Sequence, residues 1–279
     1  MRESKCSKNA YHSRYPPPCA PGNDLIKKID STISFEELSI NAWPSLQTMF
    51  YDGWLLRFSG GYTRRANSVN PLYQGSRTVN EKISECERIY FGKRMDSVFK
   101  MTSVCFPQEL DKILSERGYQ CQGETSLQIL DLEGTENSKL PRRTVALSED
   151  ASDEWLSSFC ELSGINDSKK QIARQMLQNT IPRKRVASIC NEQGKIVACG
   201  LAVLQRGYVG LFDIVTHTEY RRHGLGKQMT MALLDWAKLE HASRAYLQVV
   251  VGNEPALNLY HSLGFVERYR YWYRVKELA

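Results

Sequence analysis

The chain has 279 residues, of which 42% are hydrophobic and 24% charged, and a formal net charge of +6. This length and composition allow a core of ordinary size, so neither disulfides nor metals are needed to hold the fold. No stretch of about 18 apolar residues occurs, which excludes a membrane-spanning helix. The positive charge is spread along the chain, so nucleic-acid binding is not indicated.

Residues 1–24 are polar and include three consecutive prolines, so we expect a disordered or loosely attached tail. This segment has no continuous apolar run of the kind that a secretory signal requires, which makes the cytoplasm the expected location. None of the eight cysteines forms a C-x-x-C pair or has a histidine at zinc-finger spacing. We therefore expect structural cysteines in a reducing compartment and no metal site.

Residues 25–132 are expected to form a first folded domain. Residues 54–58 are strand-like, Gly60-Gly61 predicts a turn, and residues 63–72 are predicted to return as a second strand. The sequence from Thr78 to Glu81 has the pattern of a capping box and predicts the start of a helix, with apolar positions at Val79, Ile83, Cys86 and Tyr90.

The polar segment 133–142 predicts a linker, and residues 143–279 are expected to form a second domain. This second domain is predicted to have a helix over residues 153–162 and strands over residues 186–190, 195–204 and 208–216. One pattern occurs in both domains: strand, helix-opening proline, helix, glycine and aromatic residue, first over residues 98–119 and again over residues 246–265. This similarity indicates two related half-structures.

The segment after residue 216 is a short polar loop that leads into a helix with an apolar stripe. Such a loop presents free backbone N–H groups at a helix N-terminus, where the helix dipole also favours negative charge. Gly224 and Gly226 lack side chains, so a phosphate oxygen can approach the backbone, and Arg221 and Arg222 add positive charge. The pattern predicts a pyrophosphate cradle, although an isolated G-x-G is also typical of an ordinary turn before a helix.

A second segment follows in the expected order and spacing. Arg221, Gly224 and Gly226 are followed by Asn253, Ala256, Leu259, Tyr260, Gly264 and Phe265. Together the two segments resemble the GNAT acetyltransferase superfamily, whose signature is R/Q-x-x-G-x-G/A followed by N-x-x-A-x-x-L-Y-x-x-x-G-F. The resemblance covers residues 143–279 and implies an α/β fold with a mixed sheet. It implies a GNAT fold in the C-terminal half, packed against a smaller, GNAT-like N-terminal half.

The resemblance also implies the activity, which is transfer of an acetyl group from acetyl-CoA to a primary amine by direct attack. It assigns cofactor binding to Ile214, Val215, Thr216, Arg221, Arg222, His223, Gly224, Leu225, Gly226, Asn253 and Tyr260. The pantetheine arm would lie between two strands that splay apart. Tyr260 would also be the general acid, because a phenol can protonate a departing thiolate. Tyr260 lies on an apolar stripe as well, so a purely structural role in the core is the alternative.

The base that deprotonates the amine is not assigned by the resemblance. Asp213 lies on the strand before the cradle, where related enzymes place acceptor-binding or base residues. A glutamate is common near this position in the superfamily, but here Leu211 and Phe212 precede Asp213. Asp213 is therefore a base, a group that orients the amine through water, or a structural carboxylate hydrogen-bonded at the strand end.

The first half has no R-x-x-G-x-G equivalent, so no second CoA site is expected there. Its segment 52–68 is dense in aromatic, arginine and asparagine residues and resembles part of some bacterial two-domain GNAT proteins. Arg57, Arg64 and Asn67 either recognise a carboxylate or other polar group of the substrate, or serve the fold by pairing internally and capping turns.

The identity of the acceptor stays open among amino acids, amino sugars, polyamines, and protein lysines or N-termini, since fold analogy does not choose between them. The presence of an extra half favours a small, enclosed acceptor. The alternatives are a protein acetyltransferase and a non-catalytic CoA-binding sensor. Apart from acetyl-CoA and an amine acceptor, no partner is predicted, and the oligomeric state is not visible in the sequence.

Overall fold

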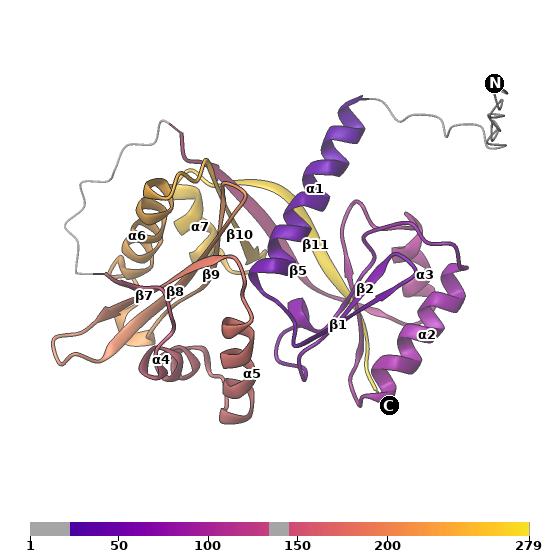
Figure 1. Ribbon diagram of the computed structural model, residues 1–279, viewed down its shortest axis with the longest axis horizontal. Coiled ribbons are helices and arrows are strands. Elements are labelled where there is room, and N and C mark those ends of the chain that lie inside the picture. Colours follow the sequence, from indigo (N-terminus) through magenta and orange to yellow (C-terminus); the bar gives the residue numbers. More distant parts are fainter. Residues whose placement is uncertain (1–22, 134–144, 279) are drawn as a thin grey trace, which may run out of the picture.

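The computed structural model describes residues 23–133 and 145–278. Their strands form one mixed sheet in the order β1-β2-β3-β4-β11-β5-β10-β9-β8-β7-β6. Figure 1 shows two lobes joined by β5 and β11, with α1 standing over the junction. The predicted α/β fold with a mixed sheet is confirmed. The predicted tail covers residues 1–24. Residues 1–22 lie outside the described residues, and residues 23 and 24 begin α1. All but the first residue of the predicted linker also lies outside them.

The first half contains a long N-terminal helix, a small sheet and two further helices. Its elements are α1 (Asn23–Ala42), β1 (Gln47–Tyr51), β2 (Trp54–Phe58), the 3-10 turn η1 (Arg64–Ala66), β3 (Val69–Asn70), α2 (Val79–Gly92), β4 (Ser97–Met101), α3 (Leu110–Glu116) and β5 (Gln120–Asp131). The predicted capping box is present, because Thr78 accepts from the N–H of Glu81 and the Glu81 carboxylate accepts from the N–H of Thr78.

The second half contains β6 (Ala146–Ser148), α4 (Asp153–Ser163), α5 (Asp167–Gln178), β7 (Arg183–Cys190), β8 (Ile196–Gln205), β9 (Tyr208–Thr216), the 3-10 turn η2 (Thr218–Tyr220), α6 (Leu225–Leu239), β10 (Arg244–Val250), α7 (Glu254–Ser262) and β11 (Val266–Lys276). Successive residues of β8 alternate between the two faces of the sheet. Leu201 and Val203 pack with α1, α4 and α5, and Ala202 packs with α6 and α7.

The strand predicted over residues 63–72 is largely absent. This segment forms a loop with the turn η1, and only Val69–Asn70 pair as β3. The reason is the side chain of Asn67, whose Oδ1 accepts from the N–H groups of Ser59 and Gly61 and whose Nδ2 donates to Thr63 O at 2.7 Å. These bonds close the chain into a compact loop, as asparagine often does in turns.

The last strand of each half is exchanged with the other half. Strand β5 pairs with β10 of the second half, and β11 pairs with β4 of the first half, while β5 and β11 pair with each other. The repeated pattern seen in the sequence leads into these two strands. In each half, the backbone N–H of the aromatic residue after the glycine donates to the carbonyl oxygen of the residue four positions before that glycine. These bonds run from Tyr119 to Leu114 O and from Phe265 to Tyr260 O. The two halves therefore share this local arrangement, and their final strands pair across the junction.

Candidate active site

The predicted cradle at the start of α6 has a run of free backbone donors. The N–H of Arg221 bonds to Thr218 O, and the N–H of Gln228 bonds to Gly224 O. Between them, the N–H groups of residues 222–227 donate to no described group. Consecutive free N–H groups at a helix N-terminus, reinforced by the helix dipole, bind phosphate groups.

The local sequence explains the shape of this cradle. Gly224 is the N-cap of α6 with a φ of +76°, a left-handed conformation that glycine adopts without strain. A Cβ atom on Gly226 would lie 3.3 Å from Leu259 Cδ2, so this glycine lets α7 pack closely against α6. The side chain of Arg221 is anchored by a bond from Nε to Thr216 O at 3.2 Å. Arg222 and His223 are exposed beside the open N–H groups.

The strands on either side of the cradle splay apart. Strands β9 and β10 are parallel and pair over only four residues, from Tyr208–Arg244 to Leu211–Leu247. Beyond this point β9 continues through Ile214, Val215 and Thr216 with no partner on the side of β10. Open strand edges of this kind can pair with the amides of an extended ligand. The residues present thus fit a cofactor with both a pyrophosphate and an amide-containing arm.

Asn253 and Tyr260 lie on α7, which follows β10. Asn253 is the N-cap of α7, and its Oδ1 accepts from the N–H of Ala256 at 3.3 Å, while no described residue accepts from its Nδ2. Tyr260 is buried against Phe265, with ring centroids 5.8 Å apart. Burial raises the pKa of the Tyr260 phenol to about 12. The hydroxyl therefore keeps its proton at neutral pH, as a proton donor must.

Asp213 lies on a β-bulge in β9. Between β8 and β9, the two residues Asp213 and Ile214 stand opposite the single residue Gly200. The φ of Asp213 is +53°, a conformation that costs energy in a non-glycine residue and that is often found at functional sites. The bulge begins just after the pairing of β9 with β10 ends, so it places this carboxylate beside the splay.

The Asp213 carboxylate is poorly supplied with partners. Its side chain is 12% exposed, and Oδ1 is 3.7 Å from Nη2 of Arg65. Oδ2 is buried and accepts no hydrogen bond from any described residue. Burial raises the pKa of Asp213 to about 6, and the nearby Arg65 guanidinium opposes this rise. One of the three interpretations of Asp213 is a structural carboxylate that is hydrogen-bonded at the strand end. That interpretation requires hydrogen bonds that are not observed here.

Arg65, Trp43 and Tyr62 come from the first half and were not singled out in the sequence. The Arg65 guanidinium lies over the rings of Trp43, at 5.5 Å, and Phe212, at 5.8 Å. Those two rings stack with an interplanar angle of 14°. Burial raises the pKa of Tyr62, and the negative charge of Asp213 adds to this rise, so this phenol lies near the same carboxylate. The sequence marked the segment 52–68 but contained no signal that separated Arg65 from its neighbour Arg64.

The three residues predicted as substrate ligands in the first half have internal partners. Arg57 is buried and donates to the carbonyl oxygens of Ile40, Trp43 and Arg65. Asn67 closes the loop described above, and Arg64 donates from Nη2 to Gln122 Oε1 at 2.5 Å. Arg57 and Asn67 thus support the loop that carries Arg65. These contacts favour the structural interpretation of all three residues.

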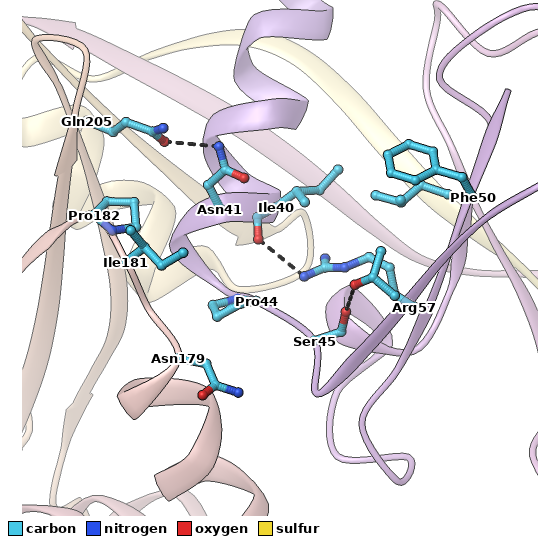
Figure 2. Close-up of a pocket in the computed structure, with 12 residues that line it drawn as sticks. Ile40, Asn41, Pro44, Ser45, Phe50, Arg57, Asn179, Ile181, Pro182 and Gln205 are labelled. Carbon is cyan, nitrogen blue, oxygen red and sulfur yellow. Dashed lines mark hydrogen bonds between the residues drawn. The ribbon is translucent and has the colours of Figure 1, made fainter.

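A cavity near the junction lies away from these residues. Figure 2 shows this cavity of about 420 Å³ between the end of α1, the strands β1 and β2, and the segment that includes Ile181 and Pro182. Its lining includes Arg57 and Gln205 but no residue of the cradle, the bulge or α7.

Among residues 23–133 and 145–278, no group of acidic, cysteine and histidine residues could hold a metal ion, and the six cysteines described there are free. No helix in that part of the chain has the length and apolar character to cross a membrane.

These features agree with a match to a known family. The family model described as "Probable histone acetyltransferase Rv0428c C-terminal" matches residues 31–274. The chain belongs to this family of GNAT acetyltransferases. Because this is a family of acetyltransferases, the chain is an acyltransferase enzyme. GNAT acetyltransferases generally bind acetyl-CoA and an acceptor.

Similar proteins support this assignment along nearly the whole chain. "Uncharacterized N-acetyltransferase YobR" from Bacillus subtilis is 27% identical over 252 residues, which is 89% of this chain and all of the relative. A GCN5-related N-acetyltransferase from Kribbella flavida has a TM-score of 0.64 at 14% identity and covers 88% of this chain and 95% of its own. A tandem GNAT protein from the clavulanic acid biosynthesis pathway has a TM-score of 0.62 at 13% identity, over 92% of this chain and 96% of its own. The GNAT fold of this acetyltransferase is thus shared over both halves.

Proposed function

We propose that this acetyltransferase transfers the acetyl group of acetyl-CoA to the primary amine of a small-molecule acceptor. The observation that carries the proposal is the run of free N–H groups at residues 222–227, beside the open edge of β9. Residues 221–226 would hold the pyrophosphate, while the backbone of Ile214, Val215 and Thr216 and the Nδ2 of Asn253 would hold the pantetheine arm.

Bound acetyl-CoA supplies a thioester carbonyl and a thiolate leaving group. We assign to Asp213 the task of binding the acceptor ammonium and taking a proton from it, because its carboxylate is buried, ionised above about pH 6 and unsatisfied at Oδ2. We assign to Tyr260 the task of donating a proton to the thiolate, because its hydroxyl stays protonated and has no partner among the described residues.

The two halves would divide the work. Residues 143–279 would form the catalytic half with the donor site, and the first half would close the acceptor side with Trp43, Tyr62 and Arg65. The small exposed fraction of Asp213, 12%, supports an acceptor whose amine enters an enclosed space. A protein lysine or N-terminus is the second candidate, because the description of the family names a histone acetyltransferase.

The proposal is tested by calorimetric titration of the protein with acetyl-CoA, followed by measurement of thiol release with a panel of amines. The panel contains amino acids, amino sugars, polyamines, and peptides with free N-termini or lysines. Binding with turnover on small amines is the expected result, and turnover on peptides alone would support the second candidate. Binding without turnover on any class would favour a CoA-binding sensor, and absence of binding would refute the assignment of the cradle.

A further inference from the structure

The surroundings of Asp213 contain a second charged group whose hydrogen-bonding capacity is unused. A guanidinium has five N–H donors. Besides its contacts with two aromatic rings, the Arg65 guanidinium has the ion pair with Asp213 at 3.7 Å, which is too long for a hydrogen bond. It donates a hydrogen bond to no described residue. Its side chain is 26% exposed, so a ligand can reach it. Arg65 and Asp213 therefore form a pair of opposite charges. The guanidinium can donate further hydrogen bonds, and the carboxylate can accept further ones.

Arg65 is held firmly in this position by its loop. Asn67 closes the loop, and Arg57 donates to Arg65 O from within the core. On the side of the second half, a Cβ atom on Gly60 would lie 2.9 Å from Ile172 Cδ1, so the loop lies tightly against α5. The rings of Trp43 and Phe212 flank the guanidinium. A guanidinium that is oriented in advance loses little entropy when it binds a carboxylate.

The pair matches a ligand that carries a positive and a negative group close together. An amino group of the ligand can donate to the carboxylate of Asp213. A carboxylate of the ligand can accept from the planar guanidinium of Arg65, whose geometry is complementary. An α-amino acid has both groups on one carbon atom. A polyamine would bring a second positive charge to Arg65. The N-terminus of a peptide has an amide where an amino acid has its carboxylate, and the carbon that bears the amine of a lysine side chain carries neither group.

We propose that the acceptor is an α-amino acid with a free carboxylate, which Arg65 binds while Asp213 binds the ammonium group. This inference rests on the proposed function. The amine nitrogen forms a bond to the acetyl carbon while the carbon–sulfur bond breaks. Two protons leave the nitrogen: Asp213 takes one and releases it to solvent, and the other replaces the proton that Tyr260 gives to the thiolate. The products are an N-acetyl amino acid and CoA.

The experiment compares three acceptors for each amino acid side chain: the free acid, the carboxamide and the decarboxylated amine. Thiol release is measured with the wild-type protein and with Arg65→Gln and Arg65→Lys. For the wild type, kcat/KM for the best free acid should exceed that of its carboxamide by about 100-fold, because a site built for a charged partner rejects an analogue that lacks it. In Arg65→Gln this preference should fall to about threefold or less, mainly through KM, and Arg65→Lys should retain part of it.

Arg64→Gln is the matched control, because Arg64 is the neighbouring arginine, is exposed and contacts Gln122. It should leave the preference for free acids unchanged, and acetyl-CoA should bind all variants with the affinity of the wild type. Arg65→Gln should also move the acid limb of the pH–rate profile upward, because Arg65 lowers the pKa of Asp213.

Two outcomes would overturn the inference while acetyl transfer itself stands. One is equal turnover of free acids and their carboxamides, and the other is an unchanged preference in Arg65→Gln. Absence of transfer to every acceptor, despite binding of acetyl-CoA, would instead refute the proposed function and this inference with it.

Discussion

The helices α2 and α6 begin at comparable places in the two halves, but their N-termini differ. At α2, the N–H groups of Ser76 and Arg77 donate to the Asp52 carboxylate, both at 2.9 Å. Lys82 pairs with the same carboxylate at 3.3 Å. At α6, the N–H groups of residues 222–227 have no acceptor among the described residues. Before α2, the chain thus supplies its own carboxylate. At the corresponding place before α6, the proposed function puts a phosphate of the cofactor.

This difference shows why we propose a cofactor site at α6 and not at α2. The donors are present at α2, but the chain supplies its own anion to them. These hydrogen bonds lower the pKa of Asp52, whereas burial without hydrogen bonds raises the pKa of Asp213. The first carboxylate stabilises the fold, and the second is left unsatisfied and able to act on a ligand.

The largest effect is expected at Tyr260. Its counterpart in the first half is Leu114, because the carbonyl oxygens of both residues accept from the N–H of the aromatic residue after the glycine. Tyr260→Phe should lower kcat for acetyl transfer by about 100- to 1000-fold, because the leaving thiolate loses its proton donor. The affinity for acetyl-CoA, measured by calorimetry, should change little. An unchanged kcat would show that Tyr260 is only a core residue.

The next effect tests the cradle by giving α6 an internal anion. Gly224→Asp should weaken binding of acetyl-CoA by about 100-fold, because a carboxylate would stand beside the free N–H groups and repel a pyrophosphate. Aspartate tolerates a positive φ better than most residues, and a Cβ atom here meets only Gln228 Nε2 at 3.9 Å. Gly224→Asn is the control of equal shape and should lose about tenfold or less. Equal losses in the two variants would show that charge is not the cause.

A third prediction concerns the stability cost of Asp213. Its pKa is raised from 3.8 to about 6 in the folded state, so the folded protein loses stability as pH rises from about 4 to 6 and stays at the lower value above that. Asp213→Asn removes this loss and should increase the free energy of unfolding by about 3 kcal/mol at pH 8 and by less than about 1 kcal/mol at pH 4. Chemical denaturation at both pH values measures the difference. An equal change at the two pH values would contradict the charge explanation.

Asp52→Asn supplies the contrast in the first half. Because the pKa of Asp52 is lowered in the folded state, its carboxylate stabilises the protein above its unfolded pKa of 3.8 and ceases to do so in acid. The variant should therefore be less stable than the wild type at pH 8. If it were more stable, the carboxylate would not be the partner that satisfies the α2 donors.

The smallest effect is the pH dependence of the reaction. Protonation of Asp213 below its pKa of about 6 should lower kcat/KM by about tenfold at pH 5 relative to the plateau. Asp52 does not titrate in this range, because its pKa is depressed. A profile measured by thiol release from pH 5 to 9 tests this, with Asp213→Asn expected to have a low, flat rate between pH 5 and 7. A wild-type profile that is flat from pH 5 to 7 would remove Asp213 from the reaction.

Local features of the fold could be predicted because neighbouring residues determine them. The capping box at Thr78 and the bounds of β2 and β9 follow from short-range patterns, and the spacing from Arg221 to Phe265 located the cradle and α7. The signal for α1 was also present, since its buried residues Phe35, Leu38 and Ala42 are spaced by three and four.

Features that depend on distant pairing could not be predicted. The position of β11 between β4 and β5 is decided by hydrogen bonds between halves that are far apart in the sequence. The same holds for Arg65, because only the closure of its loop by Asn67 decides which of two consecutive arginines faces Asp213. The sequence therefore predicted the residues of the proposed donor site, whereas Arg65 of the proposed acceptor site could be found only from the structure.

The exchanged strands make the sheet of each half depend on the other half. If a deletion removed residues 23–133, β10 would lose the partner β5 along one entire edge, and β11 would lose both of its neighbours. The second half therefore needs the first half to complete its sheet, whatever the first half contributes to chemistry. A chain shortened to either half would therefore expose unpaired strand edges, which are prone to aggregation.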